Sequence, residues 1–154
     1  MSIPFESLRM VPYLMLFATF LVALSYMIHA RIEARFRKKL PLLEIDVSQF
    51  SLALSNLLIN SIQAVLDQGE IHLFTRASKK NVFILIQDNG GGISKEDLPK
   101  IFDFMFSTKP TGSGLGLSIA KKIISDHRGE ISVKSEPNKG STFTIRIPIE
   151  TRTS

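Results

Sequence analysis

Residues 88–148 read DNGGGISKEDLPKIFDFMFSTKPTGSGLGLSIAKKIISDHRGEISVKSEPNKGSTFTIRIP and contain two glycine clusters separated by an aromatic segment. Asp88, Gly90 and Gly92 directly follow an apolar run at residues 81–87 that predicts a central strand. A carboxylate at a strand end can accept a hydrogen bond from an exocyclic amine, and glycines let the backbone approach a flat ring closely. Taken alone, the same pattern is also typical of a tight turn.

A second glycine cluster opens a predicted helix over residues 115–127. Gly112, Gly114 and Gly116 would bring backbone N–H groups and the positive helix end toward an anion, as phosphate sites require. The cluster is neither a Walker A loop nor a dinucleotide fingerprint, because the lysine-then-Ser/Thr ending is missing and no strand immediately precedes it. By itself the cluster is a weak indication of a phosphate site.

Upstream, the pattern predicts a helix from Asp46 to about Asp67, with Asp46 three residues before Gln49 as a capping-box-like start. Asn56 and Asn60 lie one turn apart on it. A carboxamide oxygen is a hard neutral ligand that suits a Mg²⁺ ion bound to substrate phosphates. The alternative is a pair of solvent-facing or capping asparagines, since Asn avoids apolar helix centres for ordinary reasons.

Between the two glycine clusters, residues 102–109 read FDFMFSTK. An aromatic hinge followed by a hydroxyl- and glycine-rich loop suits a mobile lid, with Lys109 near phosphate. The same residues are equally compatible with a hydrophobic plug followed by an ordinary loop.

The remaining elements complete one α+β domain without internal repeats. The sequence predicts a half-buried strand at 32–37, a strand at 70–76, a short helix at 94–102 and a terminal hairpin of strands 130–135 and 142–149. Gly129 is expected to stop the last helix. With no cysteine in the chain, disulfide frameworks, thiolate metal sites and cysteine nucleophiles are excluded.

The charge of the chain is unevenly distributed. The 154 residues hold 19 Lys and Arg against 14 Asp and Glu, a net charge of +5 that at first suggests nucleic acid as a partner. Residues 1–40 hold six of the bases and two of the acids, so the remaining body is almost neutral. We therefore expect no nucleic-acid partner.

The basic excess follows an apolar run from Met10 to Ala30 that carries no formal charge with His29 neutral. About 20 helical residues cross the hydrocarbon layer of a membrane. Basic residues that follow such a helix favour the cytoplasmic side, where they lie against an anionic lipid surface. We expect residues 1–29 to form an apolar helix that anchors the chain in the cell inner membrane by a single pass, with residues 30–150 as a cytoplasmic domain and residues 151–154 as a tail. The alternative is a helix buried in a soluble cytoplasmic protein.

In order and spacing, these motifs resemble the N, G1, F and G2 boxes of the catalytic and ATP-binding domain of sensor histidine kinases. That family belongs to the GHKL superfamily with the gyrase-type ATPases, and the resemblance covers about residues 30–149. It implies the Bergerat fold, a two-layer α/β sandwich with helices on one face of a mixed sheet and ATP between the helices and a lid.

The resemblance also implies roles for single residues. Asn60 would coordinate Mg²⁺, Asp88 would hold the adenine amino group, and Lys109 would approach the phosphates. Catalytic positions would be Asn56 and Lys109. The implied ATP-binding residues are Asn60, Asp88, Gly90, Gly92, Ile93, Thr108, Lys109, Gly112, Ser113, Gly114, Leu115, Gly116 and Leu117.

Position 56 distinguishes branches of this superfamily. Relatives that hydrolyse ATP or phosphorylate serine carry a Glu there, whereas Asn56 cannot act as a general base. Neutral imidazole already offers a lone pair, so transfer to a histidine needs little proton removal. The sequence therefore favours a two-component protein-histidine kinase that uses ATP and Mg²⁺ and signals to a response regulator.

Some features depart from the resemblance. Phe104 and Met105 stand where Pro and Phe are usual, and Ser61 replaces a common Ala. His29, His72 and His127 lack the sequence context of a phosphoacceptor, so the histidine would come from a dimerisation domain in another part of the protein or another chain. The alternatives are a non-catalytic nucleotide-binding or regulatory module, or a truncated kinase remnant, and less so an ATPase.

Overall fold

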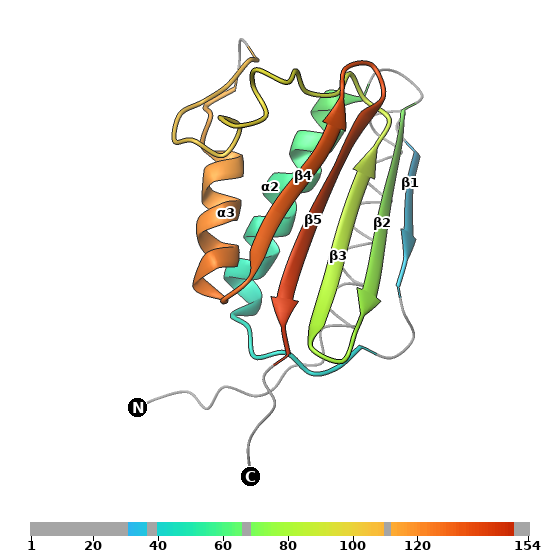
Figure 1. Ribbon diagram of the computed structural model, residues 1–154, viewed down its shortest axis with the longest axis vertical. Helices are drawn as coiled ribbons and strands as arrows, with labels where there is room; N and C mark the ends of the chain where they lie inside the picture. The colour runs from blue at the N-terminus through green and yellow to red at the C-terminus, as the bar shows by residue number, and fades with distance from the viewer. Residues whose placement is uncertain (1–30, 37–39, 66–68, 110–111, 150–154) are drawn as a thin grey trace.

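The computed structural model describes residues 31–36, 40–65, 69–109 and 112–149. They form one five-stranded sheet in the order β1-β2-β3-β5-β4 (Figure 1). The strands are β1 (Arg31–Arg35), β2 (Glu70–Ala77), β3 (Asn81–Asp88), β4 (Glu130–Glu136) and β5 (Gly140–Pro148). β1 pairs with β2 in parallel and all other pairs are antiparallel, so the sheet is mixed, as expected.

Two helices pack against this sheet: α2 (Val47–Ala64) connects β1 to β2, and α3 (Gly116–Asp126) precedes β4. Both lie over the same face in Figure 1. The fold is therefore the predicted two-layer α/β sandwich. The expected apolar helix at residues 1–29, the bases Arg37 to Lys39 and the 151–154 tail lie outside the described residues. Within the part of the chain that is described, no helix is long and apolar enough to cross a membrane.

One face of the sheet forms the core. Successive side chains of each strand point to opposite faces, and the register of the strands brings their apolar side chains together on one of them. Leu73 on β2 pairs with Ile86 on β3, which pairs in turn with Phe143 on β5, and all three are fully buried. From the helix side, Leu57 and Leu58 of α2 are equally buried. Burying one such side chain stabilises the fold by roughly 1.5–3 kcal/mol. β3 occupies the centre of the sheet, as its apolar run predicts.

The predicted start of α2 is confirmed, because Asp46 Oδ1 accepts a hydrogen bond from the Gln49 backbone N–H at 2.9 Å. Its end comes earlier than expected. Val65 is already extended, at φ −84° and ψ 141°, and its N–H bonds to the Ser61 carbonyl. The helix thus stops at Ala64 and not near Asp67.

The short helix expected at 94–102 is wrong, since this segment is a series of turns. Helix-like bonds join Leu98 N–H to the Ser94 carbonyl and Ile101 N–H to the Asp97 carbonyl. Pro99 lies between them and has no N–H to continue the ladder. The chain therefore makes successive turns here without a continuous helix.

The end of α3 corrects a second detail. Gly129 does stop the helix, and its N–H bonds to the Ile124 carbonyl at 2.9 Å. The left-handed residue of this Schellman motif is however Arg128, with φ 57°, whose N–H bonds to the Ser125 carbonyl. Gly129 instead allows the chain to pass close to β5, because a Cβ there would lie 2.9 Å from the Arg146 carbonyl oxygen.

Candidate functional site

A cavity of about 590 Å³ opens between α2, the turn after β3, residues 106–109 and 112–115, and the first turn of α3. It collects residues that are far apart in the sequence. Among the candidate residues, those that line it are Asn56, Asn60, Gly92, Ile93, Thr108, Lys109, Gly112, Ser113, Gly114, Leu115, Gly116 and Leu117. Two further candidates, Asp88 and Gly90, are buried and lie outside the lining.

The α2 wall of the cavity is one stripe of the helix. Asn56, Ile59, Asn60 and Gln63 follow one another at helical spacing, and all four line the cavity. Asn56 is close to α3, since a Cβ on Gly116 would lie 3.5 Å from Asn56 Oδ1. The Asn56 amide nitrogen is buried without a hydrogen-bond partner in the described structure. The two asparagines thus face the cavity and not the solvent side of α2.

Asp88 ends β3 beside the cavity and is only 3% exposed. Its Oδ1 accepts hydrogen bonds from the N–H groups of Gly90 at 3.0 Å and Ser141 at 3.2 Å. Its Oδ2 is buried and has no partner among the described residues. Burial raises the pKa of the Asp88 carboxyl above its ordinary value, although these two N–H groups, the Ser61 hydroxyl and the Lys109 ammonium each lower it.

Two glycines have backbone conformations that a residue with a side chain could adopt only with strain. Gly92 has φ 71°, and a Cβ there would lie 2.0 Å from the Glu136 carbonyl oxygen at the end of β4. Gly114 has φ 70°, and its Cβ would lie 2.3 Å from the Met105 carbonyl carbon. Both positions require glycine because the left-handed region and the close approach exclude a side chain. The two glycine clusters of the sequence therefore both contribute to the wall of one cavity.

The N-terminus of α3 opens at the cavity without a cap. Leu115 occupies the N-cap position in a helical conformation, its side chain makes no capping hydrogen bond, and the first turn contains no acidic residue. The first N–H groups of a helix lack intrahelical partners, and this end carries the positive end of the helix dipole. The geometry suits an anion.

Lys109 crosses the cavity to α2. Its Nζ donates hydrogen bonds to Asn60 Oδ1 at 3.2 Å and to Gln63 Oε1 at 3.0 Å. Burial lowers the pKa of the Lys109 ammonium, while the Asp88 carboxylate raises it. A cation thus already lies against the carboxamide oxygen that the sequence assigned to Mg²⁺. Within the described ranges, no group of three or more His, Cys, Asp or Glu could hold a metal ion.

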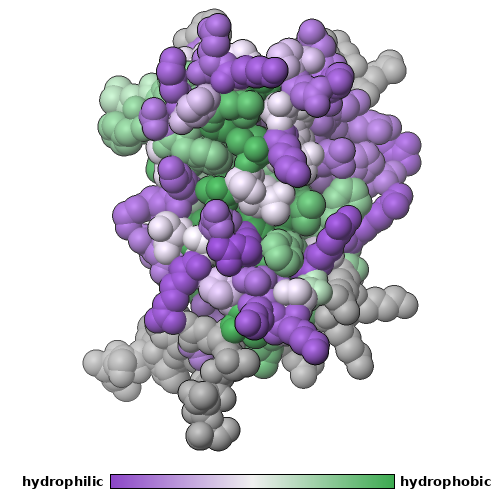
Figure 2. Space-filling model, in the orientation of Figure 1, coloured by the Kyte–Doolittle hydropathy of each residue, from purple (hydrophilic) through white to green (hydrophobic). Residues whose placement is uncertain are grey.

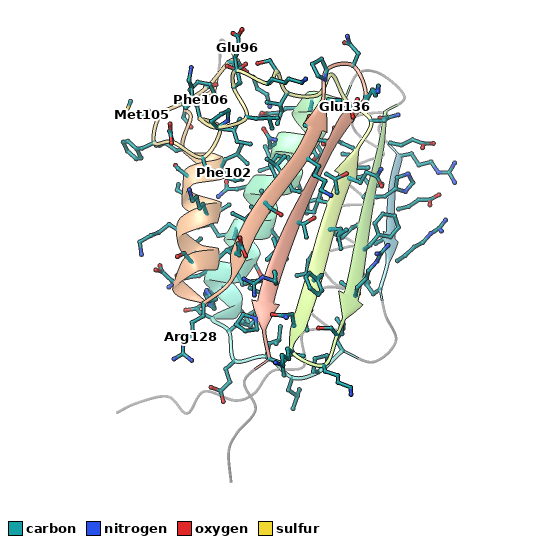
Figure 3. The ribbon with its side chains drawn as sticks, in the orientation of Figure 1. Glu96, Phe102, Met105, Phe106, Arg128 and Glu136 are labelled. Atoms are coloured by element: carbon teal, nitrogen blue, oxygen red, sulfur yellow. The ribbon has the colours of Figure 1, made fainter. Side chains whose placement is uncertain are left out.

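The 102–106 segment is divided between the core and the surface. Phe102 packs edge-on against Phe143, and Phe106 lines the cavity. Phe104 and Met105 are 74% and 68% exposed and form an apolar patch at this corner of the molecule (Figure 2). Met105 has φ 62° and points away from the domain (Figure 3). The segment is thus partly packed into the interior, as the hydrophobic-plug alternative predicted, and partly an exposed turn.

Sequence reasoning missed several residues of the site. Gln63 is not among the predicted site residues, yet its Oε1 accepts a hydrogen bond from Lys109. Ser141 lines the cavity and supports Asp88 from β5, 53 residues away. The helical spacing of Gln63 with Asn56 and Asn60 could have identified it, whereas no sequence signal pairs Ser141 with Asp88.

The described histidines have structural contacts. His127 Nε2 accepts the Asp46 backbone N–H at 2.9 Å, and its Nδ1 lies 2.7 Å from the Ile123 carbonyl, so the ring is a neutral tautomer protonated at Nδ1. His72 stacks on Phe74 near Glu33 and Glu70 on β1 and β2. Neither ring lines the cavity.

Comparison with known proteins identifies the domain. Residues 45–151 match the family described as histidine kinase-, DNA gyrase B-, and HSP90-like ATPase. The chain belongs to this family. It is 45% identical over 97 residues to the signal transduction histidine-protein kinase AtoS and 39% identical over 110 residues to the sensor histidine kinase ZraS, both from Escherichia coli strain K12. These matches cover 62% and 71% of this chain but only 16% and 24% of the two relatives.

The fold agrees with this assignment. The catalytic domain of histidine kinase ThkA superposes with a TM-score of 0.83 at 27% identity, covering 95% of this chain and 96% of that one. ShkA in complex with AMPPNP has the same fold, with a TM-score of 0.84 at 21% identity over all of this chain and 33% of its own. The described part of the chain is the ATP-binding catalytic domain of a sensor histidine kinase.

Proposed function

We propose that this domain binds ATP with Mg²⁺ in the cavity and transfers the γ-phosphoryl group to a histidine supplied by another domain or chain. The observation that carries the proposal is the buried, unpartnered Oδ2 of Asp88. A buried carboxylate oxygen without a donor is costly. The exocyclic amine of adenine is a donor of the kind that would satisfy it.

The other end of the cavity suits the triphosphate. The uncapped N-terminus of α3 offers N–H groups, and Lys109 offers an ammonium to the same cavity. Gly112 and Gly114 let the backbone follow the phosphates closely, with Thr108 and Ser113 adding hydroxyls to the lining. Base and phosphates would thus be bound by opposite ends of one cavity.

Asn60 fits Mg²⁺ as part of a nucleotide complex. Its Oδ1 faces the cavity and already accepts a hydrogen bond from the Lys109 ammonium, so a positive charge is accommodated at this oxygen. A single carboxamide suits an ion whose other ligands are phosphates and waters. When bound, Mg²⁺ supplies charge neutralisation on the phosphates. We expect Lys109 to leave Asn60 for the phosphates when the metal complex binds.

The transfer itself requires little from the protein's acids and bases. The bond from the γ-phosphorus to the bridging oxygen of ATP breaks, a phosphorus–nitrogen bond to the histidine forms, and ADP leaves. Asn56 has no basicity, and a neutral imidazole needs no base to expose its lone pair. Positioning and electrostatic stabilisation by α2 and α3 therefore supply the catalysis.

Calorimetric titration with a non-hydrolysable ATP analogue and Mg²⁺ tests the base site. Asp88→Asn replaces the accepting Oδ2 by a donor while Oδ1 keeps its two N–H partners, so we expect affinity to fall roughly 100-fold. The matched control is Asp126→Asn on the exposed side of α3, which should bind like the wild type. Equal affinity of the wild type and Asp88→Asn would contradict the assignment.

The same variant carries a pH signature. The raised pKa of Asp88 means that the folded state holds this proton more tightly than the unfolded chain. Its contribution to stability is therefore present at acid pH and is lost as pH rises through the folded-state pKa. In thermal unfolding without nucleotide, Asp88→Asn should be more stable than the wild type at neutral pH, and this advantage should shrink as the pH falls below the folded-state pKa.

A second candidate is a non-catalytic nucleotide-binding module. The exposed Phe104 and Met105, which replace the usual residues of the hinge, favour it. Such a module would bind the ATP analogue with the same Asp88 dependence but would leave an added histidine domain unlabelled by ATP.

Three partners complete the proposal: a histidine-bearing dimerisation domain, a response regulator downstream, and membrane lipid. The ThkA structure in complex with the response regulator TrrA supports the second.

The uncharged run from Met10 to Ala30 and the bases that follow it support a single-pass anchor in the inner membrane. Alkaline washing of cell membranes should leave the full chain in the pellet until detergent is added. Release by the wash alone would contradict the anchor.

A further inference from the structure

Ser61 is a buried polar residue that the nucleotide site as described does not use. It follows Asn60 on α2, its exposed fraction is 0%, and its Oγ has no hydrogen-bond partner in the described structure. A buried hydroxyl without a partner costs free energy, and native proteins retain few of them. An alanine would fill nearly the same space without that cost, so the hydroxyl calls for an explanation.

The neighbourhood of Ser61 supplies one. One turn further along α2, the Ala64 carbonyl accepts a hydrogen bond from the Gly91 N–H at 3.1 Å, so the end of this helix lies against the turn that follows Asp88. The Ser61 hydroxyl is near enough to Asp88 to lower the pKa of its carboxyl. Ser61 Oγ and Asp88 Oδ2 are thus two buried atoms without hydrogen-bond partners in the described structure, and they belong to segments that pack against each other.

We infer that Ser61 is a positioning residue of the base site, whose hydroxyl donates to Asp88 Oδ2 and orients the carboxylate toward the exocyclic amine of adenine. This rests on the proposed function of the cavity. A carboxylate oxygen can accept more than one hydrogen bond, so Oδ2 can receive the serine hydroxyl and the amine together. With Oδ1 fixed by Gly90 and Ser141, the carboxylate is then held at both oxygens.

Comparing two nucleotides separates this role from simple packing. In calorimetry on the full chain with Mg²⁺, Ser61→Ala should weaken a non-hydrolysable ATP analogue roughly three- to ten-fold, the effect of one hydrogen bond. The corresponding inosine analogue has a carbonyl in place of the amine. It gains nothing from an oriented carboxylate, so its affinity should be the same in the wild type and in Ser61→Ala.

The pH profile is the second readout. The amine binds an ionised Asp88, so affinity for the ATP analogue falls as the pH drops through the pKa of this carboxyl. The Ser61 hydroxyl lowers that pKa. Without it the pKa is higher, and the acid limb of the binding profile should move to higher pH in Ser61→Ala. A serine that only packs α2 would leave the position of this limb unchanged.

The control is Ser55→Ala, a half-buried serine on the same helix that does not line the cavity and should bind both nucleotides like the wild type. Ser61→Cys keeps the side-chain volume with a weaker donor and should follow Ser61→Ala in direction. Equal affinity of Ser61→Ala and the wild type for the ATP analogue, or equal weakening of both nucleotides, would overturn the inference. A wild type that binds neither nucleotide would instead refute the proposed function.

Discussion

The N-termini of α2 and α3 differ in whether a side chain caps them. α2 begins at Asp46, whose side chain accepts the Gln49 N–H. α3 begins at Leu115, which provides no side-chain cap. Polar side chains usually satisfy helix ends, and losing such a cap costs about 1 kcal/mol. The capped end of α2 thus serves the fold, whereas the open end of α3 leaves its first N–H groups available to the phosphates in the function proposed above.

The helix ends that lie away from the cavity support this difference between α2 and α3. His127 at the C-terminus of α3 accepts the backbone N–H of Asp46, so the capped end of α2 and the closed end of α3 are tied together away from the cavity. Arg128, at the base of α3 in Figure 3, completes the Schellman motif there. The cavity lies at the other end of α3, where the Leu115 side chain makes no capping bond and the first turn of the helix contains no acidic residue.

Among substitutions that test this difference between the helix ends, Gly114→Ala should weaken nucleotide binding most. A left-handed conformation costs a non-glycine residue about 1–2 kcal/mol, and the added Cβ would also collide with the Met105 backbone. The chain leading into α3 would be displaced, and we expect at least ~30-fold weaker binding of the ATP analogue. The control is Gly91→Ala in the other glycine cluster, where a Cβ meets no atom within 4 Å. Equal losses in both variants would show that the open end of α3 has no special role.

A smaller effect should follow when α3 is given a cap like that of α2. Leu115→Asp and Leu115→Asn both supply a capping oxygen, but only Asp adds a negative charge where phosphate would bind. We expect the Asp variant to bind the ATP analogue about five-fold more weakly than the Asn variant. Conversely, Asp46→Ala should lower the free energy of unfolding by about 1 kcal/mol and leave nucleotide affinity within two-fold. Denaturant unfolding and calorimetry on all three would show whether the two helix ends differ as described.

The sequence predicted most elements of this contrast because their signals are local. Asp46 with Gln49, the period of the α2 stripe and the apolar run of β3 each act within one element. The turn series at 94–102 was mistaken for a helix because its polar start resembles a cap, whereas Pro99 removes the N–H that a helix needs there.

The contacts that sequence could not supply are those between elements. The Ser141 N–H on β5 donates to Asp88 on β3 because of strand register, and Gln63 contacts Lys109 because the Lys109 side chain reaches α2. Neither pairing leaves a pattern along the chain. The resemblance to histidine kinases pointed to the glycines and asparagines, but the support of Asp88 by the Ser141 N–H emerged only from the packing.

The most direct test of the account is phosphoryl transfer from γ-labelled ATP with Mg²⁺ to separately purified histidine-bearing dimerisation domains of AtoS and ZraS. The catalytic domains of those relatives serve as positive controls. We expect acid-labile, alkali-stable label on the added domain, and its loss with Asn60→Ala. A chain that binds the ATP analogue but labels neither domain, while both controls do, would contradict the kinase assignment and leave a nucleotide-binding module.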